Sequence, residues 1–186
     1  MKKITSLVLA GVAAVALSTS AQAADKNFNG FYAGAELGYN NFKLIDNKSG
    51  LYYGALAGYR VQMDNDLVVG LETRFGDTTA NQTITVSTVD IDISAGRQIG
   101  VDALIGIAMG DDKDVLAFGT VGYTNARING SAADQNASAN GDGVRFAIGA
   151  EYLLTEKASL RVSGAYADYE GSARDWQLTT AVIFNF

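Results

Sequence analysis

The chain is built from segments in which apolar residues alternate with polar or small residues, the period-two pattern of a β-strand with one apolar face. The C-terminal segment QLTTAVIFNF shows this most clearly, with a mostly apolar set at every second position up to Phe186. A free C-terminus is usually frayed and solvated, so an apolar aromatic at the last position needs a structural reason. We therefore expect the last strand to lie in a sheet, with its apolar face covered, up to its final residue.

Eight segments carry this alternation. The fifth segment admits two registers, and we favour the one with Val115, Ala117, Gly119, Val121 and Tyr123 on the apolar exterior. The expected strands are residues 30–39, 51–61, 67–75, 96–109, 115–127, 144–152, 160–166 and 175–186.

The connections between these segments differ systematically in length. Three are short and polar (63–66, 110–114 and 154–158), whereas long connections rich in Asn, Ser, Ala and Gly cover 41–50, 76–90 and 127–143, and 168–175 is intermediate. An even number of antiparallel strands with short turns at one end and longer loops at the other is typical of outer-membrane barrels. A soluble β-sandwich would also alternate, but its buried face would favour bulky aliphatic residues over Ala. The pattern therefore predicts an all-β fold, an eight-stranded antiparallel up-and-down transmembrane β-barrel.

The N-terminus indicates export. Residues 1–23 combine two lysines, an apolar run from Leu7 to Leu17, and small residues before a cleavage position after Ala23, as in a cleaved signal peptide. The apolar run is shorter than the roughly 20 residues that a membrane-spanning helix needs. We expect residues 24–186 to form one outer-membrane β-barrel domain.

Composition narrows the possible functions. The net charge is −6, and losing Lys2 and Lys3 with the signal peptide, without any acidic residue, makes it −8. Such a domain repels nucleic acid. The chain has no Cys and no His, so it lacks disulfides and the commonest catalytic base and metal ligand. We expect no enzyme, no cofactor and no metal.

The inward parity class contains four acidic residues and four arginines. An eight-stranded barrel is only wide enough for its own side chains, so these charges must pair with one another. We expect Glu151 and Arg161, which lie at similar depth across the 154–158 turn, to form the first such pair. A closed lumen in which ion pairs set the strand register is favoured over a gated pore or a proton path. The expected network is Glu36, Arg60, Glu72, Arg74, Asp102, Arg145, Glu151 and Arg161.

Aromatic residues near both ends of the outward faces indicate interfacial girdles. Beyond the girdle on the long-connection side, the outward parity reaches four cations, at the level of lipopolysaccharide phosphates. Arg suits phosphate recognition, although charges that merely keep loop edges soluble explain these positions equally well. The candidate lipopolysaccharide contacts are Lys43, Arg97, Arg127 and Arg174.

Several motifs together resemble one family. The ordered set FNGFYAGAELGY, GALAGYRV, LVVGLETRF, LAFGTVGYTNA, FAIGAEYLLTEKASLRVSGAYADY and AVIFNF is similar to the opacity-type, porin-like small outer-membrane β-barrels, with OmpA and OmpX barrels as architectural kin. The resemblance implies insertion by the outer-membrane barrel assembly machinery. It also implies that a C-terminal strand serves as the recognition signal, here through Leu178, Thr180, Val182, Phe184 and Phe186.

Members of that family have structural, adhesive or immune-surface roles. We expect a monomeric structural protein of the Gram-negative outer membrane, in contact with lipid and lipopolysaccharide, which contributes to envelope integrity and surface display. The alternatives are an adhesin or receptor acting through its long connections on a host or phage ligand that the sequence does not identify, or a narrow porin-like channel.

Overall fold

The computed structural model describes residues 26–43, 47–86, 89–132, 135–170 and 173–186, so the predicted signal peptide, residues 1–23, lies outside the described residues. Within these ranges no helix is long and apolar enough to cross a membrane. The strands are β1 (Gly30–Lys43), β2 (Asn47–Gln62), β3 (Leu67–Thr78), β4 (Asn81–Val86), β5 (Val89–Met109), β6 (Val115–Ala132), β7 (Gln135–Thr155), β8 (Ala158–Tyr169) and β9 (Arg174–Asn185).

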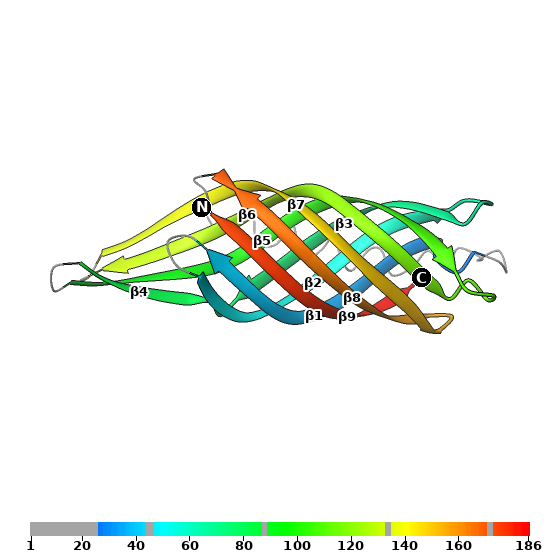
Figure 1. Cartoon of the computed structure of the whole chain (residues 1–186), viewed down its shortest axis with the longest axis horizontal. Coiled ribbons are helices and arrows are strands. Elements are labelled where there is room, and N and C mark those ends of the chain that lie inside the picture. The colour runs from blue at the N-terminus through cyan, green and yellow to red at the C-terminus, as the bar shows by residue number, and fades with distance from the viewer. Residues whose placement is uncertain (1–25, 44–46, 87–88, 133–134, 171–172) are drawn as a thin grey trace.

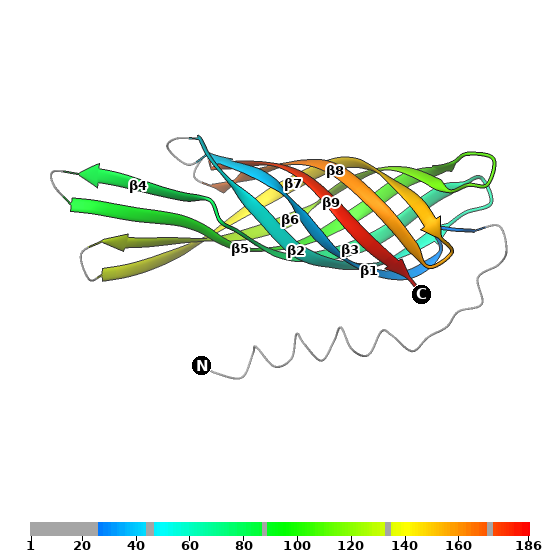
Figure 2. The same cartoon turned by 90° about the horizontal axis from the view of Figure 1, so that it is seen from below.

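The sheet closes on itself (Figures 1 and 2). Strand β1 pairs antiparallel with β2 on one side and with β9 on the other, and β3 pairs with β5. Strand β4 continues along β5 beyond the end of β3, so β3 and β4 share one position in the wall. At the seam, the backbone N–H of Phe186 donates to the carbonyl of Phe31 at 2.9 Å. The predicted eight-stranded antiparallel barrel is confirmed.

Alternation of side chains is strict in the wall. Along β9, buried and exposed residues alternate from Arg174 to Asn185, and the exposed set includes Trp176 and Leu178, each 61% exposed. In β6, Val121 and Tyr123 are about half exposed whereas Leu116 is fully buried, which confirms the favoured register of that strand. Large apolar side chains therefore cover the outside of the barrel, where a bilayer would solvate them.

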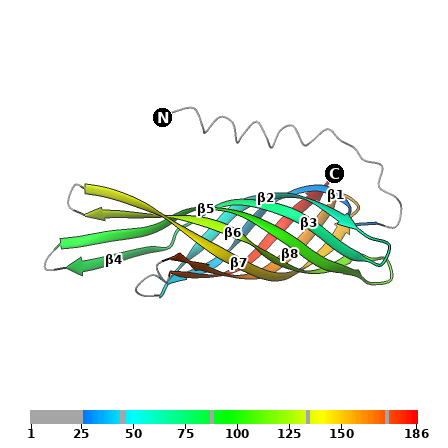
Figure 3. The same ribbon diagram turned by 90° about the horizontal axis from the view of Figure 1, so that it is seen from above.

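The long connections are shorter than predicted, because strands continue beyond the barrel rim. Residues expected in the loops 76–90 and 127–143 instead form part of β3, β4, the start of β5, the end of β6 and the start of β7, with pairings such as Val86 with Val89 and Ala132 with Gln135. Figures 1 and 3 show these two hairpins projecting past the other strands. Residues 127–143 carry no clear apolar alternation, whereas residues 84–86 and 89–93 do carry it but follow the polar run DTTANQT, which favours a loop.

Two details mark the limits of the wall. The β5–β6 register shifts between Ala95 and Gln98, where the strands pass from the barrel into the projecting hairpins. At the opposite end the predicted short turns are present, with left-handed backbone at Asp66 (φ 63°) and Lys113 (φ 53°). The barrel thus has a short-turn end and an end with projecting hairpins.

Candidate functional site

The lumen contains the charged residues that the sequence placed inside. All eight point inward and are at most 6% exposed. They come from six strands, so the charges link the wall across its interior rather than along one strand. The charge network, as we name it, comprises Glu36, Arg60, Glu72, Arg74, Asp102, Arg145, Glu151 and Arg161.

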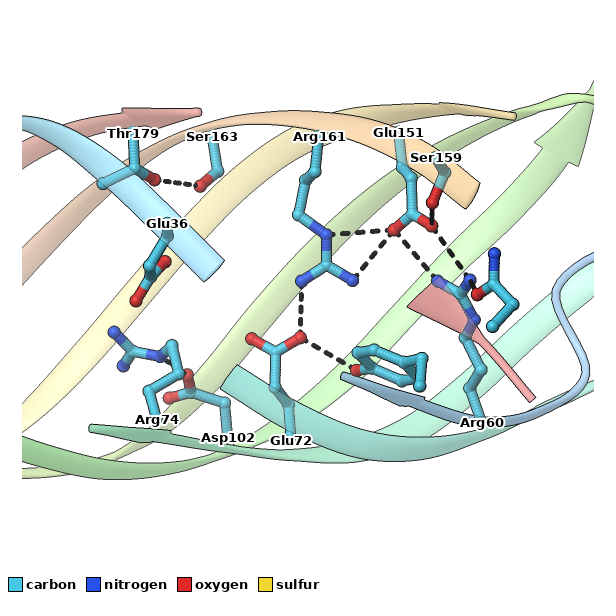
Figure 4. Close-up of polar contacts among 12 residues, drawn as sticks. Glu36, Arg60, Glu72, Arg74, Asp102, Glu151, Ser159, Arg161, Ser163 and Thr179 are labelled. Atoms are coloured by element: carbon cyan, nitrogen blue, oxygen red, sulfur yellow. Dashed lines mark hydrogen bonds and ion pairs between the residues drawn. The ribbon is translucent and has the colours of Figure 1, made fainter. Parts of the chain in front are cut away.

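Glu151 is the centre of one half of this network (Figure 4). Its carboxylate accepts two hydrogen bonds from Arg60, at 3.0 and 2.9 Å, and one from Arg161 Nε at 3.0 Å. Ser159 donates its hydroxyl to the same carboxylate, and Arg161 also pairs with Glu72. Two arginines and two carboxylates from β2, β3, β7 and β8 are therefore joined in one cluster.

Asp102 is the centre of the other half. Its Oδ2 lies 2.7 Å from Arg74 Nε and 3.3 Å from Arg145 Nη1. Glu36 accepts a hydrogen bond of 2.7 Å from the neutral hydroxyl of Tyr52. Charge-assisted bonds of this kind offset the cost of keeping ions away from bulk water.

Two buried tyrosines support the network, and the sequence reasoning gave them no role. The Tyr32 hydroxyl donates to Glu72 at 2.8 Å, and the guanidinium of Arg60 lies 4.5 Å from the centre of its ring. Each ring lies over a glycine: a Cβ on Gly58 would stand 2.6 Å from Tyr32, and one on Gly76 would stand 2.3 Å from the Tyr52 hydroxyl. A tyrosine and a glycine of inward parity on neighbouring strands are the signal that could have found this packing.

A layer of amides lies nearer the projecting hairpins. The carboxylate of Asp175 accepts hydrogen bonds from Gln177 at 2.7 Å, Gln98 at 3.0 Å and Asn40 at 3.3 Å. Asn40 in turn accepts from the Thr78 hydroxyl at 2.6 Å. A search for opposite charges misses this layer because its donors are neutral.

Apolar clusters occupy the lumen at both ends. Between them, a cavity of about 10 Å³ lies among charge-network residues including Glu36, Arg74 and Arg161, which is room for about one water molecule. In the described part of the chain, the lumen is therefore filled by side chains. The short-turn cluster is Phe28, Val68, Leu104, Ala108, Leu116, Phe118 and Leu153, and the cluster at the hairpin end is Phe42, Ala80, Ala126, Ala167, Tyr169 and Ala173.

The four candidate cations at the hairpin end form two pairs rather than one patch. Lys43 and Arg174 are cross-strand partners on β1 and β9, and Arg174 lies 3.8 Å from Asp168. Arg127 lies on β6 opposite the register shift that contains Arg97 on β5. Two strands separate the pairs in either direction around the wall, so they lie on opposite sides of the barrel.

The C-terminal residues implied as an assembly signal form one outward row along β9 and the residue that follows it, Phe186. Leu178, Val182, Phe184 and Phe186 are between 40% and 61% exposed, and Thr180 is exposed beside them. No group of three or more side chains suited to a metal ion was found among the described residues.

A closed barrel with an apolar exterior and a charged, packed interior defines a transmembrane β-barrel of the outer membrane. Residues 10–186 match the family described as outer membrane protein beta-barrel domain, and the chain belongs to this family. The outer membrane is accordingly its location. No curated protein matches the sequence.

Solved structures show the same fold at low identity. Neisserial surface protein A is 17% identical with a TM-score of 0.63, covering 85% of this chain and 98% of that one. The attachment invasion locus protein Ail of Yersinia pestis is 16% identical with a TM-score of 0.59, covering 85% and 99%. OprG of Pseudomonas aeruginosa is 13% identical with a TM-score of 0.60, covering 85% and 96%.

Proposed function

We propose that this protein is a monomeric, non-enzymatic structural component of the outer membrane, which stabilises the envelope and displays two hairpins outside it. The observation that carries the proposal is the filled lumen: compensated charges and two apolar clusters occupy the interior of the described barrel. A barrel whose lumen is filled in this way is suited to a structural role in the membrane rather than to the passage of solutes.

Strand register gives the charge network a role in this function. A one-residue slip between neighbouring strands would turn inward charges toward lipid, where a charged side chain costs about 2–4 kcal/mol at the bilayer midplane. Ion pairs that reach across the lumen, such as Arg60 with Glu151, hold strands that are far apart in sequence in one alignment. Buried ion pairs lose their hydration, but in return they can select one strand register over the alternatives.

Lipopolysaccharide is the partner that the rim cations favour. Lys43 and Arg174 are placed directly across from each other, an arrangement of like charges that destabilises a sheet unless an anion lies between them. The phosphates of the outer leaflet supply such anions. We assign Lys43, Arg97, Arg127 and Arg174 to lipopolysaccharide contact. Asp168, which lies beside Arg174, offsets part of the positive charge that Lys43 and Arg174 present to an anion.

A double exchange tests this assignment. In a strain carrying Arg97→Gln and Arg127→Gln, sensitivity to bile-type detergents should rise, because two phosphate contacts are lost while the barrel still folds. The control exchanges Lys113 and Lys157, which lie in or beside short turns at the other end, for Gln and should leave sensitivity unchanged. Equal sensitivity of the two strains would count against lipopolysaccharide contact.

An adhesin or receptor role is the second candidate, and the projecting hairpins favour it. Strands β4 to β7 carry backbone pairing well beyond the register shift at Ala95, so the surface outside the membrane is an ordered sheet. Ail, which has this fold, has been crystallised with the heparin analogue sucrose octasulfate. A polysulfated sugar is therefore a rational first ligand to test on this chain.

Complementation distinguishes the two candidates. A strain lacking the protein should shed vesicles and become detergent-sensitive, and a barrel with β4–β5 and β6–β7 shortened to tight turns should restore it. If only the full-length protein restores the envelope, or if loss of the protein has no envelope phenotype, the hairpins carry the function.

A further inference from the structure

The segment before the first strand folds into the short-turn end of the barrel. Phe28 is fully buried in the short-turn cluster, and it is the one member of that cluster that precedes the strands. Figure 2 shows the blue start of the described chain at the same end as the C-terminus. Residues 26–29, which we call the N-terminal plug, thus add an aromatic ring to the strand side chains that fill this end of the lumen.

Specific polar contacts hold the N-terminal plug. The backbone N–H of Phe28 donates to Gln62 Oε1 at 3.0 Å. The Asn27 side chain donates to the carbonyls of Asp112 and Lys113, at 2.7 and 3.0 Å. The ammonium of Lys26 lies 2.7 Å from Asp64, and this hydrogen bond and charge hold the pKa of Asp64 below its usual range.

The ring also touches the charge network. The guanidinium of Arg60 lies 4.9 Å from the centre of the Phe28 ring and bonds to Glu151 on its other side. Phe28 therefore separates the Arg60 and Glu151 pair from the solvent at the short-turn end. A cation against an aromatic face is stabilised most strongly where water is excluded.

We propose that the N-terminal plug is a removable seal on the lumen, which controls access of periplasmic solutes to the charge network. The segment continues into β1 and is held in addition by the contacts described above, whereas the strands of the wall form continuous backbone ladders with their neighbours, as β1 does with β2 and β9. Segments with few backbone bonds open at lower free-energy cost than the barrel around them. The seal therefore opens without unfolding the wall, and this inference does not depend on the proposed envelope role.

A single cysteine tests access directly, since the chain contains none. Ser159 is fully buried and bonded to Glu151, so Ser159→Cys reports the arrival of a small reagent beneath the plug. In lipid vesicles, iodoacetamide should label this cysteine slowly in the otherwise unchanged protein. Adding Phe28→Ala should raise the labelling rate by about tenfold or more, because loss of a fully buried ring shifts the opening equilibrium strongly.

A matched exchange at the other end is the control. Phe42 is also a buried aromatic, 6% exposed, but belongs to the cluster at the hairpin end, so Phe42→Ala should leave labelling of Cys at 159 unchanged. Asn27→Ala keeps the ring and removes two hydrogen bonds, and it should give an intermediate rate. Folding of every variant is scored by its mobility in unheated detergent gels.

The proposal is overturned if labelling is as fast with Phe28 as without it, or if Phe42→Ala accelerates labelling as much as Phe28→Ala. Should Phe28→Ala fail to fold, Asn27→Ala decides alone: an unchanged rate contradicts the seal, and a raised rate supports it. Because labelling is measured on purified protein, loss of the envelope role in cells would not affect this result.

Discussion

One carboxylate, that of Glu151, holds two arginines in the lumen. Glu151→Gln keeps the shape but leaves Arg60 and Arg161 with less than their compensating charge, so we expect a loss of about 3–5 kcal/mol in unfolding free energy. Glu36→Gln should cost only about 1–2 kcal/mol, because Glu36 accepts its hydrogen bond from the neutral Tyr52 hydroxyl. Urea unfolding in lipid vesicles measures both, and similar losses would contradict the assignment of Glu151 as the centre.

The glycines of the wall differ in how closely neighbouring atoms approach them. A Cβ on Gly76 would press on the Tyr52 ring and hydroxyl, whereas one on Gly164 would meet nothing within 4 Å. Gly76→Ala should therefore destabilise the barrel by about 1–3 kcal/mol through overpacking. Gly164→Ala should stay within about 0.5 kcal/mol of the parent in the same unfolding experiment. Equal behaviour would show that Tyr52 is not packed on that glycine.

At the scale of elements, β9 combines closure with the proposed assembly signal. Phe186 bonds through its backbone to Phe31, and its exposed ring ends the outward row of β9. Phe186→Ala should sharply lower the folded amount in cells but leave spontaneous folding into vesicles almost unchanged, because the backbone bond remains. Phe31→Ala, an outward aromatic on the neighbouring strand, is the control. Equal losses in cells for both variants would argue against a signal specific to β9.

At the scale of the whole molecule, we expect the barrel not to conduct ions. With the lumen filled along the described residues, the intact protein should carry no steady ion current in a planar bilayer. Conductance steps whose size changes in Glu72→Gln or Arg161→Gln would instead identify a narrow channel through the charge network.

Sequence and structure agree where a membrane imposes a rule. Lipid on one side and a narrow lumen on the other force the alternation of β9, and the same rule placed Glu151 and Arg161 on one face. The projecting part of β5 alternates too, with Val89, Ile91 and Ile93 between aspartates, but it follows the polar run DTTANQT, which favours a loop, and the end of β6 has no such alternation. Phe28 and the amides around Asp175 were not predicted for different reasons. Phe28 is a buried ring outside any strand, so no periodic pattern marks it. The amides are neutral donors to a carboxylate, so a search for opposite charges does not find them.

The register shift between Ala95 and Gln98 separates two regimes of evolutionary constraint. On the barrel side of this shift, an inserted residue would exchange the lipid-facing and lumen-facing side chains that follow it, so strand length cannot change without cost. On the hairpin side, the shift already interrupts the alignment of β5 with β6, so the change of register caused by an added or deleted residue need not extend into the wall. Homologous genes should therefore accumulate length differences beyond this point, giving lineages distinct outer surfaces on an invariant transmembrane scaffold.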